Sequence, residues 1–216
     1  MDRREAIKST AVIGAAATLP RFAWAEGNRA QLRVGLIGCS GRGLGAVKNM
    51  MDAAKGSVKL VAIADLFPDR LKLAMDKFAM YQAKFDSCKD NFDIPESRQY
   101  AGWDAYKQLI DQADVDVVIN ATPPVFRPLH LRAAVEAGKH IFVEKPACVD
   151  PVQARELFEI ADLADKKGLT IIPGVQRRFH PGYMEAIKRL QDGQIGEIVS
   201  VQAYWLNSRF FVQDGG

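Results

Sequence analysis

A cluster of glycines follows a short apolar run near the start of the chain and could bind a phosphate group. Residues 33–37 are mostly apolar, residues 38–43 read Gly-Cys-Ser-Gly-Arg-Gly, and a helical pattern follows. Glycines let the backbone turn sharply beside a pyrophosphate, and a helix start offers it unpaired N–H groups. A second apolar run, residues 58–65, ends in Asp65, which could accept hydrogen bonds from both hydroxyls of an adenosine ribose. This order predicts a dinucleotide-binding βαβ unit.

The glycine spacing departs from the G-x-G-x-x-G pattern at one position. The three pattern positions are Gly38, Ser40 and Gly43, and a Ser40 hydroxyl could itself donate to a phosphate. The alternative is a plain strand, turn and helix that binds no ligand. We expect binding, and the predicted cofactor contacts in this unit are Gly38, Cys39, Ser40, Gly41, Arg42, Gly43 and Asp65.

Composition and charge are those of an ordinary globular protein. The chain has 216 residues, of which 48% are hydrophobic and 25% charged, and its net charge is +3. Removing residues 1–25 takes away four basic and two acidic side chains and leaves a net charge of +1. A nearly neutral chain argues against nucleic acid as a partner.

The first 25 residues are typical of an export signal rather than of a folded element. Arg3 and Arg4 precede a weakly apolar stretch at residues 9–19, and Ala23-Trp24-Ala25 offers small residues for cleavage. The pattern is similar to a twin-arginine (Tat) signal, and the apolar stretch is shorter than the roughly 20 residues that span a bilayer. We therefore expect a periplasmic or otherwise exported protein without a stable membrane anchor. A basic leader on a cytoplasmic protein is the alternative.

Cysteine and histidine spacing predicts neither a metal site nor a structural disulfide. No C-x-x-C pair occurs, and the histidines lie far apart in the sequence. The residues concerned are Cys39, Cys88, Cys148, His130, His140 and His180.

Short apolar runs alternate with helical patterns from residue 33 to about residue 192. This alternation predicts an α/β fold with a doubly wound parallel sheet covered by helices on both faces. After the glycine loop, helices are expected at residues 68–84, 103–113, 128–137, 151–167 and 181–191, and strands at 115–121, 140–144 and 169–173. Residues 85–98 are polar and mixed, and predict a surface insertion.

The end of the sequence has a different pattern. Residues 197–205 alternate apolar and polar side chains, as a strand with one solvated face does. We expect this strand to begin an α+β domain with a mostly antiparallel sheet, and we suspect that the sequence is truncated. The predicted organisation is a signal peptide at 1–25, a dinucleotide-binding domain at 32–175 and the start of a substrate domain at 176–216.

Four motifs in order give the chain a family resemblance. They are the glycine loop, Ala121-Thr122-Pro123-Pro124, the segment from Lys139 to Pro146 with its Glu144-Lys145-Pro146 end, and Gly174 to Pro181 with Arg177-Arg178. Together they resemble the Gfo/Idh/MocA oxidoreductases, the family of glucose–fructose oxidoreductase and inositol dehydrogenase. Some members of that family carry a twin-arginine signal. The resemblance covers residues 32–216.

The resemblance implies roles for particular residues. Lys145 is similar to the family's catalytic lysine, and Glu144 would accept a hydrogen bond from the nicotinamide ribose. Thr122 and Pro123 should pass near the cofactor, and a cis bond before Pro146 would direct Lys145 inward. Arg177, Arg178 and His180 are the candidate substrate-binding residues. The family often has a histidine five positions after the threonine, where this chain has Arg127.

Three functions remain open from the sequence. The first is an NAD(P)-dependent oxidoreductase that acts on a sugar, a cyclitol or a sugar derivative. The second is a glycosidase-like enzyme of the same family that retains NAD, and the third is a non-catalytic nucleotide-binding module if the chain ends at residue 216. Asp65 favours NAD, whereas Arg42 and Arg70 leave NADP possible. We expect a carbohydrate-like small molecule as the substrate and a homo-oligomer as the assembly.

Overall fold

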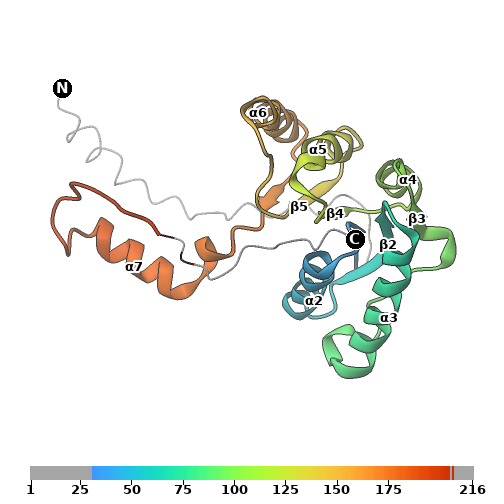
Figure 1. Ribbon diagram of the computed structural model, residues 1–216. Coiled ribbons are helices and arrows are strands. Elements are labelled where there is room, and N and C mark those ends of the chain that lie inside the picture. Colours follow the sequence, from blue (N-terminus) through green and yellow to red (C-terminus); the bar gives the residue numbers. More distant parts are fainter. Residues whose placement is uncertain (1–30, 205, 207–216) are drawn as a thin grey trace, which may run out of the picture.

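Six parallel strands form one sheet in the order β3-β2-β1-β4-β5-β6 in the computed structural model, which describes residues 31–204 and 206 (Figure 1). This is the strand order of a doubly wound dinucleotide-binding fold, so the predicted fold class is confirmed for this part of the chain. The strands are β1 (Leu32–Ile37), β2 (Val58–Asp65), β3 (Gln99–Ala101), β4 (Val117–Asn120), β5 (His140–Val143) and β6 (Ile171–Pro173).

Helices cover both faces of the sheet (Figure 1). Apolar side chains of α2 (Gly41–Ala54) and α3 (Pro68–Lys84) pack with those of β1 and β2 in one buried cluster. A second cluster joins the opposite face to α4 (Ala105–Gln112), α5 (Arg127–Glu136) and α6 (Pro151–Lys166). Because all six strands run in the same direction, their carboxyl ends meet at one edge of the sheet, where ligands bind in such folds.

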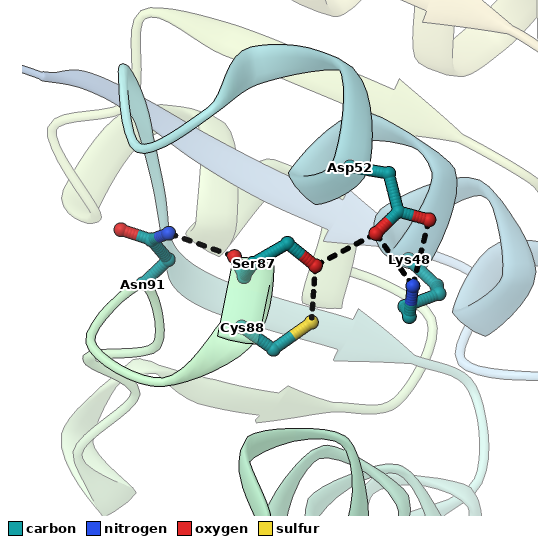
Figure 2. A network of polar contacts seen from close by, with 5 residues as sticks. All are labelled: Lys48, Asp52, Ser87, Cys88 and Asn91. Carbon is teal, nitrogen blue, oxygen red and sulfur yellow. Dashed lines mark hydrogen bonds and ion pairs between the residues drawn. The ribbon is translucent and has the colours of Figure 1, made fainter. Parts of the chain in front are cut away.

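The predicted surface insertion at residues 85–98 is wrong in part, because several of its side chains are buried. Cys88 is fully buried, Ile94 is 8% exposed, and two short 3-10 helices, η1 (Asp86–Cys88) and η2 (Glu96–Arg98), shape the segment. Figure 2 shows how η1 is attached: the Ser87 hydroxyl donates to Asp52 on α2 over 2.7 Å. Asn91 donates to the Ser87 carbonyl over 2.9 Å (Figure 2). The segment therefore forms part of the domain's packing.

The sequence did not predict strand β3, which pairs in parallel with the end of β2. Its Cα partners include Tyr100 with Ala64 and Ala101 with Asp65. With only three residues and one buried side chain, it has no periodicity of its own. Its pairing places Gly102 and Trp103 beside the end of β2.

The C-terminal part differs from the expectation. Helix α7 (Pro181–Gln191) forms as predicted and extends from η4 (Gln176–Phe179) away from the sheet (Figure 1). Residues 197–204, which were predicted to form a strand, carry no strand and are exposed. An isolated strand has no partner for its backbone N–H and C=O groups, and no antiparallel sheet lies within the described residues. The predicted signal peptide at 1–25 lies outside them.

Residues 31–204 and 206 contain neither a membrane-spanning helix nor a cluster of metal ligands. No helix there combines the length and the apolar character that crossing a membrane requires. No group of three or more His, Cys, Asp or Glu side chains in that range could hold a metal ion.

Candidate cofactor and active site

The glycine loop is held by direct contact with the loop that follows β4. Gly38 has a φ of +97°, and a Cβ at this position would lie 2.8 Å from the carbonyl carbon of Ala121. A Cβ at Gly43 would lie 2.1 Å from the Gly38 carbonyl oxygen. The first and third pattern glycines are therefore required by packing. Ser40 precedes α2 and is exposed, and its side chain does not cap the helix, so its hydroxyl faces the loop surface.

Asp65 is fixed by two backbone N–H groups. Its Oδ2 accepts a hydrogen bond from Cys39 over 2.7 Å, and its Oδ1 accepts one from Phe67 over 3.1 Å. The hydrogen bond from Cys39 joins the end of β2 to the glycine loop, so a ribose bound by Asp65 would lie next to that loop. The Cys39 thiol is buried, and burial together with the Asp65 charge raises its pKa, so it stays protonated. Cys39 therefore acts here through its backbone and not through its sulfur.

A pocket of about 470 Å³ opens beside Asp65. Its walls come from the glycine loop, from the start of α3 and from the segments that follow β3 and β4. Its lining includes five predicted cofactor contacts, which are Gly38, Ser40, Asp65, Thr122 and Pro123. Four aromatic side chains that the sequence did not predict complete it, which are Phe67, Trp103, Tyr106 and Phe126. Trp103 and Phe126 meet edge to face with ring centroids 6.1 Å apart and form one apolar side of the pocket, the aromatic wall.

A buried histidine supports the β4 side of this pocket. The Thr122 hydroxyl donates to Asn120 Oδ1 over 2.8 Å and lies 3.3 Å from His130 Nδ1. The His130 ring packs on Tyr106 with centroids 4.3 Å apart. Burial lowers the pKa of His130 to about 4, so the ring is neutral at physiological pH. His130 thus orients Thr122 without adding charge to the pocket.

Glu144 and Lys145 follow β5 at the same edge of the sheet. The Glu144 side chain is 2% exposed, and its Oε1 lies 2.6 Å from Arg42 Nη2 at the start of α2. This contact is an ion pair without hydrogen-bond alignment, so Oε1 has no hydrogen-bond partner, and neither does the buried Nδ2 of Asn120 on β4. A buried polar group without a partner costs about 1–3 kcal/mol, so the Asn120 Nδ2, at the strand end next to Glu144, indicates a place for a ligand acceptor.

Lys145 itself is exposed at this edge. The bond between Lys145 and Pro146 is cis, as the resemblance implied. Neither Glu144 nor Lys145 lines the pocket beside Asp65. The edge of the sheet therefore offers two regions, with Asp65 and the aromatic wall in one, Glu144 and Lys145 in the other, and the glycine loop between them.

Arg127 joins the loops after β4 and β5. Its guanidinium is buried and donates to the Thr122 carbonyl over 2.8 Å and to the Glu144 carbonyl over 2.6 Å. It also donates to the Pro146 carbonyl. The sequence identified Arg127 only as a departure from the family's histidine, because its partners are backbone atoms that no side-chain pattern reveals.

The three predicted substrate-binding residues do not line the pocket beside Asp65: Arg177 and Arg178 lie in η4, and His180 is the N-cap of α7. His180 caps this helix, since its Nδ1 accepts a hydrogen bond from the Gly182 N–H over 3.2 Å. Arg177 donates to the Tyr183 hydroxyl over 2.9 Å, and Arg178 is exposed. These contacts are local, and a role in substrate binding stays a prediction.

The family is decided by the match over the sheet domain. Residues 32–175 match the model of the oxidoreductase family GFO_IDH_MocA, described as having an NAD-binding Rossmann fold. The chain belongs to the Gfo/Idh/MocA family. The residues described above fit a dinucleotide, because the glycine loop and the start of α2 lie beside Asp65 at the carboxyl ends of the strands, next to the pocket.

The proteins similar to this chain carry names that give different reactions. A glycosyl hydrolase family 109 protein of Stenotrophomonas maltophilia is 28% identical over 205 residues, which cover 94% of this chain and 42% of that protein. A 3-ketoreductase of Actinomadura kijaniata, solved with TDP-benzene and NADP, is 25% identical with a TM-score of 0.57, covering 78% of this chain and 46% of that one.

A further solved structure supports the fold alone. Scyllo-inositol dehydrogenase from Lactobacillus casei, solved with NAD(H) and scyllo-inositol, is 22% identical with a TM-score of 0.56. The match covers 77% of this chain and 43% of that one. The chain spans less than half the length of these Gfo/Idh/MocA relatives and solved structures.

Proposed function

We propose that this protein is an NAD(P)-dependent oxidoreductase that transfers a hydride between the cofactor and a hydroxyl or carbonyl of a sugar, a cyclitol or a sugar derivative. The observation that carries the proposal is the arrangement at the sheet edge. There, buried Glu144 and exposed Lys145 follow β5, and Arg42 of the glycine loop pairs with Glu144. A cofactor that crossed the loop from Asp65 would bring its second ribose to Glu144.

The residues divide the work between binding and proton transfer. Bound NAD(P) supplies the site that accepts or donates the hydride. Asp65 accepts hydrogen bonds from the hydroxyl groups of the adenosine ribose, and N–H groups at the start of α2 bind the pyrophosphate. Glu144 accepts a hydrogen bond from the nicotinamide ribose. Lys145 hydrogen-bonds the reacting substrate oxygen and moves its proton.

The test is a comparison of substitutions at two positions in the full-length protein. Lys145→Ala should keep cofactor affinity but lower turnover roughly 10²–10⁴-fold, the usual effect of a positioned acid–base group. Lys145→Arg should restore little, because a guanidinium does not release its proton. Asp65→Ala should do the reverse, weakening NAD binding while turnover at saturation changes little. Turnover is followed by NADH absorbance with a panel of cyclitols and hexoses. Normal turnover in Lys145→Ala would remove the catalytic assignment.

NAD rather than NADP is the proposed cofactor. The Asp65 carboxylate is oriented by two N–H groups at the position that receives the adenosine 2′-hydroxyl, and it would repel a 2′-phosphate. Arg70 lines the same pocket and favours the opposite choice, and the Actinomadura relative was solved with NADP. Titration with both cofactors decides between the two, and tighter binding of NADP would show that the arginine outweighs Asp65.

A second candidate is a glycosidase-like reaction with a retained cofactor, in which the sugar is oxidised, loses its aglycone and is reduced again. The similarity to a glycosyl hydrolase family 109 protein over 94% of the chain favours it. Both reactions would use Lys145. Release of an aglycone without net NADH formation would support the glycosidase, whereas NADH formed in proportion to product would support the dehydrogenase.

The organisation of the whole chain also remains a proposal. We propose that residues 1–25 are a twin-arginine signal, that 32–175 bind the cofactor and that 176–216 begin a substrate domain with an antiparallel sheet. The Arg3-Arg4 pair supports export in the folded state. Fractionation of cells that express the wild type or an Arg3→Lys/Arg4→Lys variant tests it. Equal retention of both in the cytoplasm would contradict export.

A further inference from the structure

Arg127 is a charged side chain that is buried at the start of a helix. Arg127 is 5% exposed and is the first residue of α5, where the helix dipole disfavours a positive charge. Burial lowers the pKa of its guanidinium, and the nearby Glu144 charge only partly offsets this effect. A buried charge destabilises a fold unless hydrogen bonds or other charges compensate it. The partners of the guanidinium therefore indicate what it does.

Those partners are three backbone carbonyls from two loops. Nε donates to Thr122, and Nη1 donates to Glu144 and to Pro146. Thr122 forms a wall of the pocket beside Asp65, and Glu144 and Pro146 are the two neighbours of Lys145. Only the planar guanidinium presents several donors in fixed directions, so it can join both loops at once. Arg127 thus fixes the backbone on both sides of Lys145 relative to the pocket.

We propose that Arg127 is a positioning residue that sets Glu144 and Lys145 at the correct place for the nicotinamide half of the cofactor. The inference rests on the proposed function, since it needs a cofactor that reaches both regions. It predicts an asymmetry. Thr122 keeps its hydrogen bond to Asn120 when the guanidinium is lost. The loss should therefore weaken ligands that extend to Glu144 and spare ligands that occupy only the region of Asp65 and the glycine loop.

The experiment compares ADP with NADH as calorimetric probes of the full chain. ADP ends at the pyrophosphate, whereas NADH continues to the second ribose and the nicotinamide. Arg127→Met should weaken NADH binding about 10-fold or more, the effect of losing hydrogen bonds to a charged group, and change ADP binding less than about 2-fold. Amide hydrogen exchange over residues 144–148 should become faster in the same variant. Arg127→Lys should lose less NADH affinity than Arg127→Met, because an ammonium group keeps part of the contacts with the carbonyl groups.

Arg132→Met is the matched control on the same helix. Arg132 pairs with Glu156 and Glu159 on α6, away from the strand ends, so its loss should leave both ligands bound as in the wild type. Equal weakening of ADP and NADH in the Arg127 variants would overturn the positioning role in favour of general support of the fold. Unchanged NADH binding would overturn it as well.

The design separates this inference from the proposed function. A wild-type protein that binds neither ADP nor NADH would refute the proposed function and the inference together. If the wild type binds ADP and NADH and the Arg127 variants bind both ligands as tightly as the wild type does, only the role of Arg127 is refuted. If Arg127→Met does not fold, Arg127→Lys carries the same comparison, with a smaller but still selective loss for NADH.

Discussion

Replacing Gly43 by alanine should destabilise the domain through a clash between backbone atoms. The added Cβ would lie 2.1 Å from the Gly38 carbonyl oxygen and 3.2 Å from both Ala121 Cβ and Leu36 Cδ1. No side-chain rotation relieves the first contact, so α2 must move away from β1 by roughly 1 Å. Overpacking in a well-packed region costs about 1–3 kcal/mol, and a clash against backbone belongs at the upper end, near 3 kcal/mol.

Gly41→Ala is the matched control in the same loop. A Cβ at Gly41 meets no atom within 4 Å, and alanine favours helix, so this variant should equal or exceed the wild type in stability. Urea unfolding followed by circular dichroism gives both free energies. The Gly43 variant should also bind NADH more weakly, because its helix start has moved. If Gly43→Ala unfolds within about 0.5 kcal/mol of the wild type, the packing argument is refuted.

Two further predictions concern buried titratable groups. His130 has a pKa of about 4 in the fold and near 6.5 in the unfolded chain, so the unfolded chain binds its proton first as the pH falls. The free energy of unfolding is therefore highest above pH 6.5 and decreases as the pH falls toward 4, by about 2 kcal/mol between pH 7 and 5. Urea titrations should show a smaller loss in His130→Gln, and an identical slope would contradict this. In the native protein, iodoacetamide should label Cys148 well before the buried, protonated Cys39, and equal labelling rates by mass spectrometry would contradict the assignment.

Residues that act locally made the helices predictable. Helix α6 begins at Pro151 after Asp150, whose side chain accepts the Gln153 N–H over 2.8 Å, as expected of an N-cap. Helix α5 ends just before Gly138, which has a φ of +73°. Such capping residues determine helix ends through contacts a few positions away, so the sequence alone reveals them.

Features that depend on distant backbone atoms could not be predicted. Strand β3 exists because Tyr100 and its neighbours pair with β2, about 36 residues earlier in the chain. The wall formed by Trp103 was missed for the same reason, since its position follows from that pairing. Arg127 forms its bonds with carbonyl groups, which every residue carries, so no side-chain pattern identifies them. The positions of the glycine loop and Asp65 were predictable, because strand, glycine cluster, helix and second strand follow one another directly in the sequence.

The two outer strands of the sheet limit how copies of this domain could associate. One outer strand, β3, has three residues, and further along the same edge Leu60 is already hydrogen-bonded to Asn91 and Asp93. The opposite outer strand, β6, also has three residues and ends in Pro173. Long unpaired edges promote aggregation by strand addition, and short edges that are covered or end in proline prevent it. A homo-oligomer of this domain would therefore assemble through side-chain surfaces and not by continuing the sheet from one copy to the next.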